Sequence, residues 1–240
     1  TMLQFYCPAI ESLPVLPVSD SNHAVRVLRM HEGDLLQVID GRGHAFDCRL
    51  TAAHPKKAVL EIIAKRDMPL PWDYCITVAV APTKSMDRME WMVEKLTEIG
   101  INRIVPLKCE HSERKDIKTE RLKKVAVAAM KQSLKSVLPQ IDEMTPMRDF
   151  LTRQHPDQKF IAYCDDIHQR QELACRYIAG KSATILIGPE GDFSPDEIRA
   201  AIESGCQPIT LGANRLRTET AALVAVDTCH ILSQTARCRG

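Results

Sequence analysis

The stretch Ile185–Ile198 reads ILIGPEGDFSPDEI, and it decides the fold. An apolar run typical of a buried strand ends at the loop Gly188-Pro189-Glu190-Gly191. Beyond the loop, Ser194 is a favoured N-cap residue, Pro195 suits the first helical position, and Glu197 completes a capping box. The stretch therefore predicts a strand, a glycine-bearing loop that allows close backbone approach, and a helix that begins at Pro195.

Apolar runs and helical periods alternate in the same way from Tyr74 onward, which predicts an α/β domain with a mostly parallel sheet. The predicted strands are CITVAVA (75–81), RIVPLKC (103–109), KFIAYC (159–164), ATILIG (183–188) and PITLG (208–212). The predicted helices cover residues 85–99, 119–138, 169–179, 195–204 and 218–234.

The first part of the chain has a different pattern. Short segments with β-like alternation are separated by turn residues, and they are HAVRVLRM (23–30), DLLQVID (34–40), HAFDCRL (44–50) and KAVLEII (57–63). We therefore expect a small β-barrel domain over residues 1–66. A stiff linker with Pro69 and Pro71 follows over 67–74, and the α/β domain occupies 75–240.

The composition limits the possible classes of protein. The nine cysteines among 240 residues are odd in number and form no Cys-x-x-Cys, which argues against a disulfide framework and a zinc site. The eight histidines have no metal-ligand spacing, so we expect no metal. No apolar run is long enough for a membrane span, and the start of the chain lacks a secretory signal pattern. A reducing, cytoplasmic compartment fits this pattern best.

Positive charge is concentrated in one region, although the formal net charge is only +1. Residues 108–135 contain nine Lys or Arg against four Asp or Glu. Helical spacing aligns Lys84, Arg88, Trp91 and Lys95 on one helix face, and it aligns Lys124, Lys131 and Lys135 on another. A solvated surface and a binding site for a polyanion both explain such clusters, and two stripes in one domain favour a phosphate-rich partner.

A second glycine-bearing loop follows the next predicted strand, within ITLGANRLRTETAAL (209–223). Gly212 ends this strand, and Thr218 can cap a long helix. Open α/β sheets bind ligands at the carboxyl ends of their strands, although an ordinary βα turn would have the same local sequence. The two loops bring together Arg215, Arg217, Glu190 and Glu219, a set suited to a zwitterionic ligand and an anionic one. The helix after Thr218 is apolar almost all round, so we expect a second subunit to cover part of it.

The sequence argues against two nucleotide-binding classes. Gly180-Lys181-Ser182 resembles part of a phosphate loop, but Cys175 stands where that motif needs glycine, and a strand follows instead of a helix. We therefore interpret Gly180 as a helix C-cap. No Gly-x-Gly-x-x-Gly opens a helix, so a dinucleotide-binding fold has no support.

The two loops, together with KQSLKSVLPQI (131–141), resemble the three knot-forming segments of SPOUT methyltransferases. The order of motifs is similar to one family in that class, the bacterial small-subunit ribosomal RNA uridine N3-methyltransferases (RsmE). HAVRVLRMHEGDLLQVIDGRG (23–43) resembles the PUA-like RNA-binding barrel of that family, and KSMDRMEWMVEKLTEIG (84–100) resembles its first long helix. Gln132-Ser133, IGPEGDFSPDEI (187–198) and LRTETAAL (216–223) complete the resemblance.

This resemblance implies a PUA-like barrel followed by an α/β SPOUT domain with a deep trefoil knot, in a homodimer. It also implies S-adenosyl-L-methionine as cofactor and methylation of N3 of a decoding-region uridine in 16S rRNA, within the small ribosomal subunit. The expected cofactor contacts are Ile187, Gly188, Pro189, Glu190, Gly191, Leu211, Gly212, Asn214, Leu216, Arg217 and Thr218. We expect catalytic roles for Arg217, Glu219 and Arg215. The expected RNA contacts are Arg26, Arg29, Arg42, Lys84, Arg88, Lys95, Arg114, Lys131 and Lys135.

The chain departs from the usual family pattern at three places. Asn214-Arg215 replaces Arg-Ile, Asp192 stands where a second glycine is usual, and Lys135 stands where arginine is usual. Two alternatives remain open at this stage. One is a knotted methyltransferase that acts on transfer RNA or on a ribose oxygen, and the other is a non-catalytic RNA-binding assembly factor.

Overall fold

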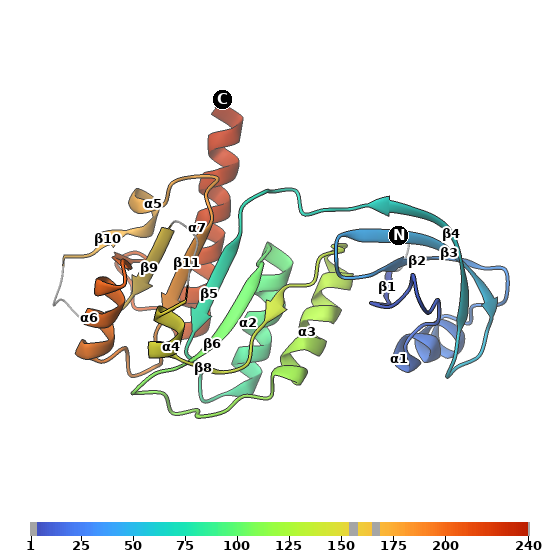
Figure 1. Cartoon of the computed structure of the whole chain (residues 1–240), viewed down its shortest axis with the longest axis horizontal. Coiled ribbons are helices and arrows are strands. Elements are labelled where there is room, and N and C mark those ends of the chain that lie inside the picture. The colour runs from blue at the N-terminus through green and yellow to red at the C-terminus, as the bar shows by residue number, and fades with distance from the viewer. Residues whose placement is uncertain (1–3, 154–157, 165–168, 240) are drawn as a thin grey trace. The chain divides into compact units, whose positions relative to one another are not determined.

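The computed structural model describes residues 4–153, 158–164 and 169–239. The chain forms two compact units, shown in Figure 1. The N-terminal unit contains the residues up to Trp72 together with Val127–Leu138, and the C-terminal unit contains Asp73–Ala126 and the residues from Pro139 onward. Each unit has its own cluster of buried hydrophobic side chains.

The N-terminal unit is built on a four-stranded sheet in the order β1-β2-β3-β4. Its strands are β1 (Gln4–Tyr6), β2 (Leu35–Ile39), β3 (His44–Ala52) and β4 (Val59–Asp67). β1 pairs parallel with β2, and the other neighbours pair antiparallel. Alternating side chains place Phe5, Val38 and Phe46 together in the core, so three of the predicted segments are strands as expected.

The segment 23–30, which we expected to be a strand, is helical. α1 (Val18–Asn22) leads directly into a π-helix, η1 (His23–Val27). Ala24 is fully buried and Leu28, four residues later, packs against the same core, whereas Val27 is exposed. The apolar residues that matter therefore follow a helical spacing, and the alternation in HAVRVLRM is misleading.

α3 (Thr119–Gln132) is shorter than the predicted helix over 119–138. Leu134 adopts a left-handed conformation with φ of 55°, and the Lys135 amide donates to the Met130 carbonyl, a bond typical of a helix end. Residues beyond it pair with the turn between β2 and β3, because the Gly43 amide donates to Ser136 and the Leu138 amide to Gly41. These bonds explain why Val127–Leu138 belongs to the N-terminal unit.

The C-terminal unit contains an eight-stranded sheet whose pairs are all parallel. The strand order is β10-β12-β9-β11-β5-β6-β7, and β8 pairs with β6. The strands are β5 (Ile76–Val80), β6 (Arg103–Lys108), β7 (Gln140–Ile141), β8 (Thr145–Pro146), β9 (Gln158–Ala162), β10 (Gln171–Glu172), β11 (Ala183–Ile187) and β12 (Gln207–Thr210). β5 and β11 are buried along their whole length, as expected of central parallel strands.

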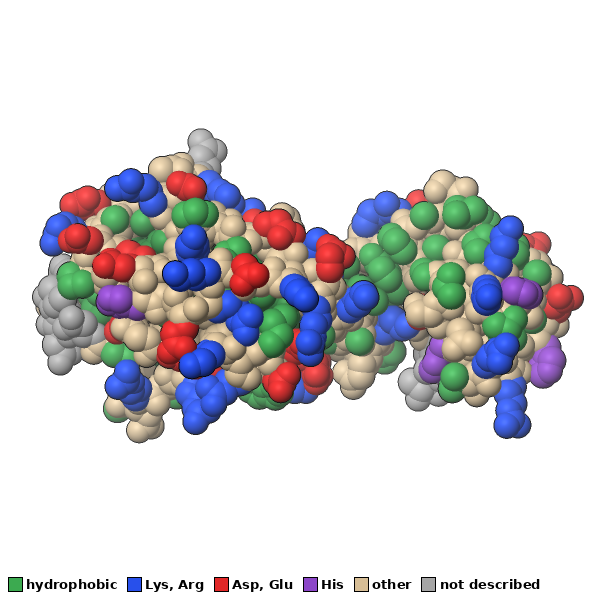
Figure 2. Space-filling model, turned by 90° about the horizontal axis from the view of Figure 1, so that it is seen from below, with side chains coloured by type: hydrophobic (Ala, Val, Ile, Leu, Met, Phe, Trp, Pro, Cys, Tyr) green, Lys and Arg blue, Asp and Glu red, His purple; other side chains and the backbone are tan. Residues whose placement is uncertain are grey.

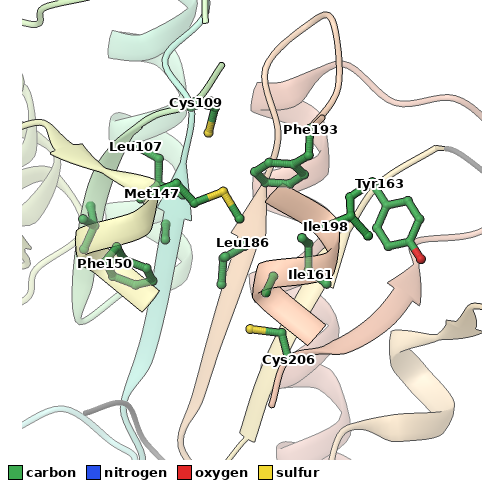
Figure 3. Close-up of a cluster of buried hydrophobic side chains, with 14 residues drawn as sticks. Leu107, Cys109, Met147, Phe150, Ile161, Tyr163, Leu186, Phe193, Ile198 and Cys206 are labelled. Carbon is green, nitrogen blue, oxygen red and sulfur yellow. The ribbon is translucent and has the colours of Figure 1, made fainter. Parts of the chain in front are cut away.

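Helices cover both faces of this sheet. α4 (Met147–Leu151) and α6 (Pro195–Glu203) contact each other and pack on β6 and β9. Figure 3 shows the side chains between them, where Met147, Phe150 and Ile198 meet Leu186 of β11. α2 (Met86–Ile99) packs against α7 (Thr218–Arg239), which also contacts β5 and β11. The predicted helix over 85–99 is confirmed, and α7 extends beyond its predicted end.

Some predicted helix boundaries are confirmed and others are wrong. Ser194 and Glu197 form the predicted capping box, in which each side chain accepts a hydrogen bond from the other residue's amide. The helix predicted over 169–179 is wrong, because only α5 (Leu173–Arg176) is helical and a short strand precedes it. Gly180 is therefore not a helix C-cap but lies in a turn with φ of 75°.

Buried cysteines contribute to the cores of both units, and all nine cysteines are free thiols. Burial raises the pKa of Cys48 and of Cys229 to about 12, so both thiols stay protonated at neutral pH. No helix in the described part of the chain is long and apolar enough to cross a membrane.

Candidate functional site

A cavity of about 1490 Å3 lies in the C-terminal unit, at the carboxyl ends of β9, β11 and β12. This is where parallel sheets usually bind their ligands. Both glycine-bearing loops contribute to its wall, as the sequence predicted. The expected cofactor contacts that line the cavity are Ile187, Gly188, Pro189, Glu190, Leu211, Gly212, Asn214, Leu216, Arg217 and Thr218. Gly191 does not line it, whereas Arg215, Lys84 and Arg88 do.

The loop after β11 is held by contacts on its inner side. The Asp192 amide donates to the Pro189 carbonyl at 2.9 Å, which closes a four-residue turn. A Cβ atom at Gly188 would lie 3.0 Å from the ring of the buried Phe193, so a side chain there would require the ring to move. Glycine at 188 therefore permits the loop to pack tightly over the end of β11.

Asp192 has a structural role that the sequence did not reveal. Its φ of 64° lies in the left-handed region, which glycine, asparagine and aspartate tolerate best. Its carboxylate accepts hydrogen bonds from the amides of Cys164 at 2.7 Å and Phe193 at 2.9 Å. The residue therefore ties the segment after β9 to the loop after β11.

The segment after β6 braces both neighbouring loops, and we did not predict this from the sequence. His111 Nδ1 donates to the Asp192 carbonyl at 3.1 Å, and the Glu110 amide donates to Glu197 Oε1 at 2.9 Å. Arg114, which we expect to contact RNA, donates to the carbonyls of Thr83 at 3.1 Å and Lys84 at 2.5 Å. The strand order could have indicated these contacts, because β6 ends at the same edge of the sheet as β11.

Thr218 connects the two glycine-bearing loops. Its hydroxyl donates to the Gly188 carbonyl at 3.1 Å, and both groups are buried. The Ala221 amide donates to the Arg217 carbonyl, so Arg217 precedes the first turn of α7. The prediction that Thr218 caps this helix is therefore wrong, because Thr218 is the first residue of α7 and the cap position is Arg217.

Arg88 on α2 lies between two carboxylates at the edge of the cavity. Its Nη1 is 3.4 Å from Glu190 Oε1, and its Nε is 3.7 Å from Glu219 Oε1. Glu219 is only 6% exposed, and its Oε2 has no hydrogen-bond partner among the described residues. The structure thus brings together Glu190, Glu219, Arg215 and Arg217 around this edge, with Arg88 as an additional cation.

Other expected RNA contacts are engaged with carboxylates. Lys84 lies 3.3 Å from Glu113, and Lys95 contacts both Glu94 and Glu98. In the N-terminal unit, Lys131 binds both oxygens of Asp20, and Arg42 contacts Asp40. Arg26 and Arg29 are exposed, and Lys135 is half-buried. Figure 2 shows the same mixture, with positive and negative side chains interspersed on the face in view.

Known proteins resemble both units of this chain. Residues 70–230 match the RNA methyltransferase domain family, and residues 16–63 match the RNA methyltransferase PUA domain family. A ribosomal RNA small subunit methyltransferase E from Buchnera aphidicola is 30% identical over 222 residues, which cover 87% of this chain and 85% of the relative. The chain belongs to this RNA methyltransferase family.

Solved structures of similar proteins extend this result to the fold. A probable rRNA-methyltransferase from Porphyromonas gingivalis superposes with a TM-score of 0.94 and 43% identity, over 98% of this chain and 100% of that one. A ribosomal RNA small subunit methyltransferase E from Neisseria gonorrhoeae, bound to S-adenosyl methionine, has a TM-score of 0.83 and 27% identity, over 97% and 98%. The predicted RsmE resemblance is confirmed, as is the predicted class, a PUA-like β unit followed by a mostly parallel α/β domain of SPOUT type.

The contact between Thr218 and Gly188 can be tested with an isosteric substitution. Thr218→Val removes the donor and leaves a buried carbonyl unpaired, so the free energy of unfolding of this RsmE-family chain should fall by about 1–3 kcal/mol. Thr228→Val is the matched control, because the Thr228 hydroxyl donates to Val224 within the same helix. We expect it to change the free energy of unfolding by less than about 0.5 kcal/mol. Denaturant titration measures both values, and equal losses would contradict the role given to Thr218.

Proposed function

We propose that this protein transfers a methyl group from S-adenosyl-L-methionine to N3 of a decoding-region uridine in 16S rRNA of the small ribosomal subunit. The observation that carries this proposal is the cavity at the ends of β9, β11 and β12, built from the two loops that resemble RsmE cofactor loops. A ribosomal substrate and nine free thiols both suit the reducing cytoplasm.

The residues of the cavity fit this cofactor. Backbone groups can approach a ligand closely at Gly212, where φ is 109° and a Cβ atom would meet no other atom within 4 Å. Apolar side chains such as Leu211 and Leu216 suit the adenine ring, and polar groups at the rim suit the amino acid part. The residues that would hold the cofactor are Ile187, Gly188, Pro189, Glu190, Leu211, Gly212, Asn214, Leu216, Arg217 and Thr218. When bound, the cofactor supplies an electrophilic methyl group on a positively charged sulfur.

The chain must make the uracil nitrogen nucleophilic. N3 of neutral uracil carries a proton whose pKa lies about two units above neutrality, so forming the anion costs about 3 kcal/mol. Arg217 and Arg215, both exposed at the cavity, would stabilise the negative charge that develops on the uracil oxygens. Glu219, with Glu190, would orient the base or accept the proton. Holding nitrogen and methyl carbon close together would provide most of the remaining acceleration.

The N-terminal unit would hold the RNA around the target nucleotide. Arg26 and Arg29 are exposed, and Arg42 extends from the turn between β2 and β3. The paired cations Lys84, Lys95 and Lys131, and the braced Arg114, are weaker candidates because binding a phosphate would require them to give up existing partners. Lys135 also remains a candidate.

A variant with both Arg26→Ala and Arg29→Ala should make fewer phosphate contacts. Its affinity for RNA should therefore fall less steeply with salt concentration than the affinity of the wild type.

We also propose that the protein acts as a homodimer. α7 uses one side against α2, β5 and β11, while Leu223 and Val224 are half-buried and Ile231 is exposed. A second copy would remove these apolar side chains from water. Sedimentation velocity tests this, since a species of monomer mass at micromolar concentration would contradict it.

The proposed reaction can be tested directly on ribosomal RNA. RNA from a strain that lacks this gene should carry an unmodified uridine where the wild-type strain has N3-methyluridine, and small subunits from that strain should accept one methyl group from the purified protein. Mass spectrometric mapping before and after the reaction locates the methyl group. A methyl group on transfer RNA or on a ribose oxygen would replace the proposed substrate, and cofactor binding with no transfer to any RNA would favour a non-catalytic role.

The proposed catalytic groups can be separated from cofactor binding. Arg217→Ala and Glu219→Gln should each lower the single-turnover rate by about a hundredfold or more, because each removes a charge that acts on the reacting base. Calorimetry should still detect binding of S-adenosylmethionine to both variants. Rates close to that of the wild type in both variants would rule out this assignment.

A further inference from the structure

A second, smaller cavity lies between the first turns of α2 and α7. Its volume is about 300 Å3, and it is lined by Asp87, Arg88, Trp91, Glu219 and Thr220. Arg88 lines this cavity and the larger one described above. Arg88 therefore adjoins both cavities, which places the smaller cavity next to the expected cofactor site.

Glu219 gives this cavity an unsatisfied acceptor. The side chain is buried, and its Oε2 makes no hydrogen bond to any described residue. Its other oxygen is 3.7 Å from Arg88 Nε, and the N-terminus of α7 favours a negative charge at this position. A buried carboxylate oxygen without a partner is costly, so a ligand N–H that binds there would remove a penalty already present in the free protein.

Trp91 gives the same cavity an aromatic surface. Trp91 is 42% exposed, although the next two residues of α2, Met92 and Val93, are fully buried. An exposed indole next to a buried acceptor is suited to a flat ring that stacks on the indole while its edge faces the carboxylate. Thr220 adds a hydroxyl at the wall, and Arg88 adds N–H groups that can bind carbonyl oxygens.

We propose that this cavity receives the target base, with the uracil ring stacked on Trp91 and its N3–H directed at Glu219 Oε2. The inference rests on the proposed function and adds the location of the base. In the reaction, the N3–H bond breaks and its proton passes to Glu219. N3 then forms a bond to the methyl carbon as the bond from that carbon to sulfur breaks, and the electron pair stays on sulfur.

The arrangement also selects the base. Uracil presents an N–H donor at N3 between two carbonyl oxygens, which matches a carboxylate beside donors from Arg88 and Thr220. Arg215 and Arg217 line the larger cavity, so in this pose they would act on the uracil oxygens from that side. Cytosine presents an unprotonated N3, whose lone pair would face the carboxylate of Glu219. Two hydrogen-bond acceptors, cytosine N3 and the Glu219 carboxylate, would then face each other in a buried cavity. Their repulsion would disfavour cytosine more strongly than the loss of one hydrogen bond would.

Single-turnover transfer from labelled S-adenosylmethionine to small subunits that lack the modification tests the base site. Stacking of one base on an aromatic side chain corresponds to a factor of about 5–150, so Trp91→Ala should lower the rate at subsaturating subunit concentration by that factor. Trp91→Phe, which keeps a ring, should recover most of the loss. Ile178→Ala is the matched control, because Ile178 is 62% exposed and lines neither cavity. Calorimetric affinity for S-adenosylmethionine should be the same in all of these proteins.

The outcomes separate this inference from the proposed function. Absence of transfer by the wild-type protein would refute the proposed function, and the base site with it. Normal transfer by the wild type and equally fast transfer by Trp91→Ala would refute only the base site. A slow Trp91→Ala variant that sediments as a smaller species than the wild type would assign Trp91 to the subunit contact and also refute the base site. Subunits with cytidine at the target position should accept no methyl group, and their methylation at N3 would overturn the role given to Glu219.

Discussion

The hydrogen bond from Thr218 to the Gly188 carbonyl fixes the start of α7 against the loop that follows β11. β11 cannot shift, because it is buried between β5 and β9 and paired with both along its length. The capping box at Ser194 fixes the other end of the loop. Since Arg217 and Glu219 flank Thr218 in the chain, their positions at the edge of the cavity follow from this one contact.

Acidic and basic side chains at the edge of the large cavity differ in burial. Glu219 is buried, while Arg215 and Arg217 are exposed at the cavity. A polyanion that approaches from solvent would meet the exposed guanidinium groups first, and only a ligand that enters would meet the carboxylate. The contacts of Arg88 with Glu190 and Glu219 offset the electrostatic cost of two carboxylates near each other.

The sequence predicted those parts of the fold in which local chemistry and burial agree. β5 and β11 were expected because continuous apolar runs mark central parallel strands, and the start of α6 was expected because a capping box uses only local residues. The errors occur where tertiary contacts decide. The alternation in 23–30 hid a helical spacing, and the end of α3 depends on a left-handed Leu134 that local sequence does not indicate. Cation stripes were visible, but the carboxylates that bind Lys84 and Lys131 come from distant parts of the chain.

Asp192 shows why a departure from a family pattern need not mean loss of the family's geometry. Asp192 is left-handed, a conformation that suits the glycine which the family resemblance implies here, and aspartate is among the few residues with a side chain that accept it. The carboxylate then accepts hydrogen bonds from Cys164 and Phe193 that glycine could not accept. Because these bonds join the segment after β9 to the loop after β11, a displacement of one wall of the cavity would be transmitted to the other. Aspartate at position 192 is therefore less free in its backbone than glycine would be, but it connects two walls of the same cavity by hydrogen bonds.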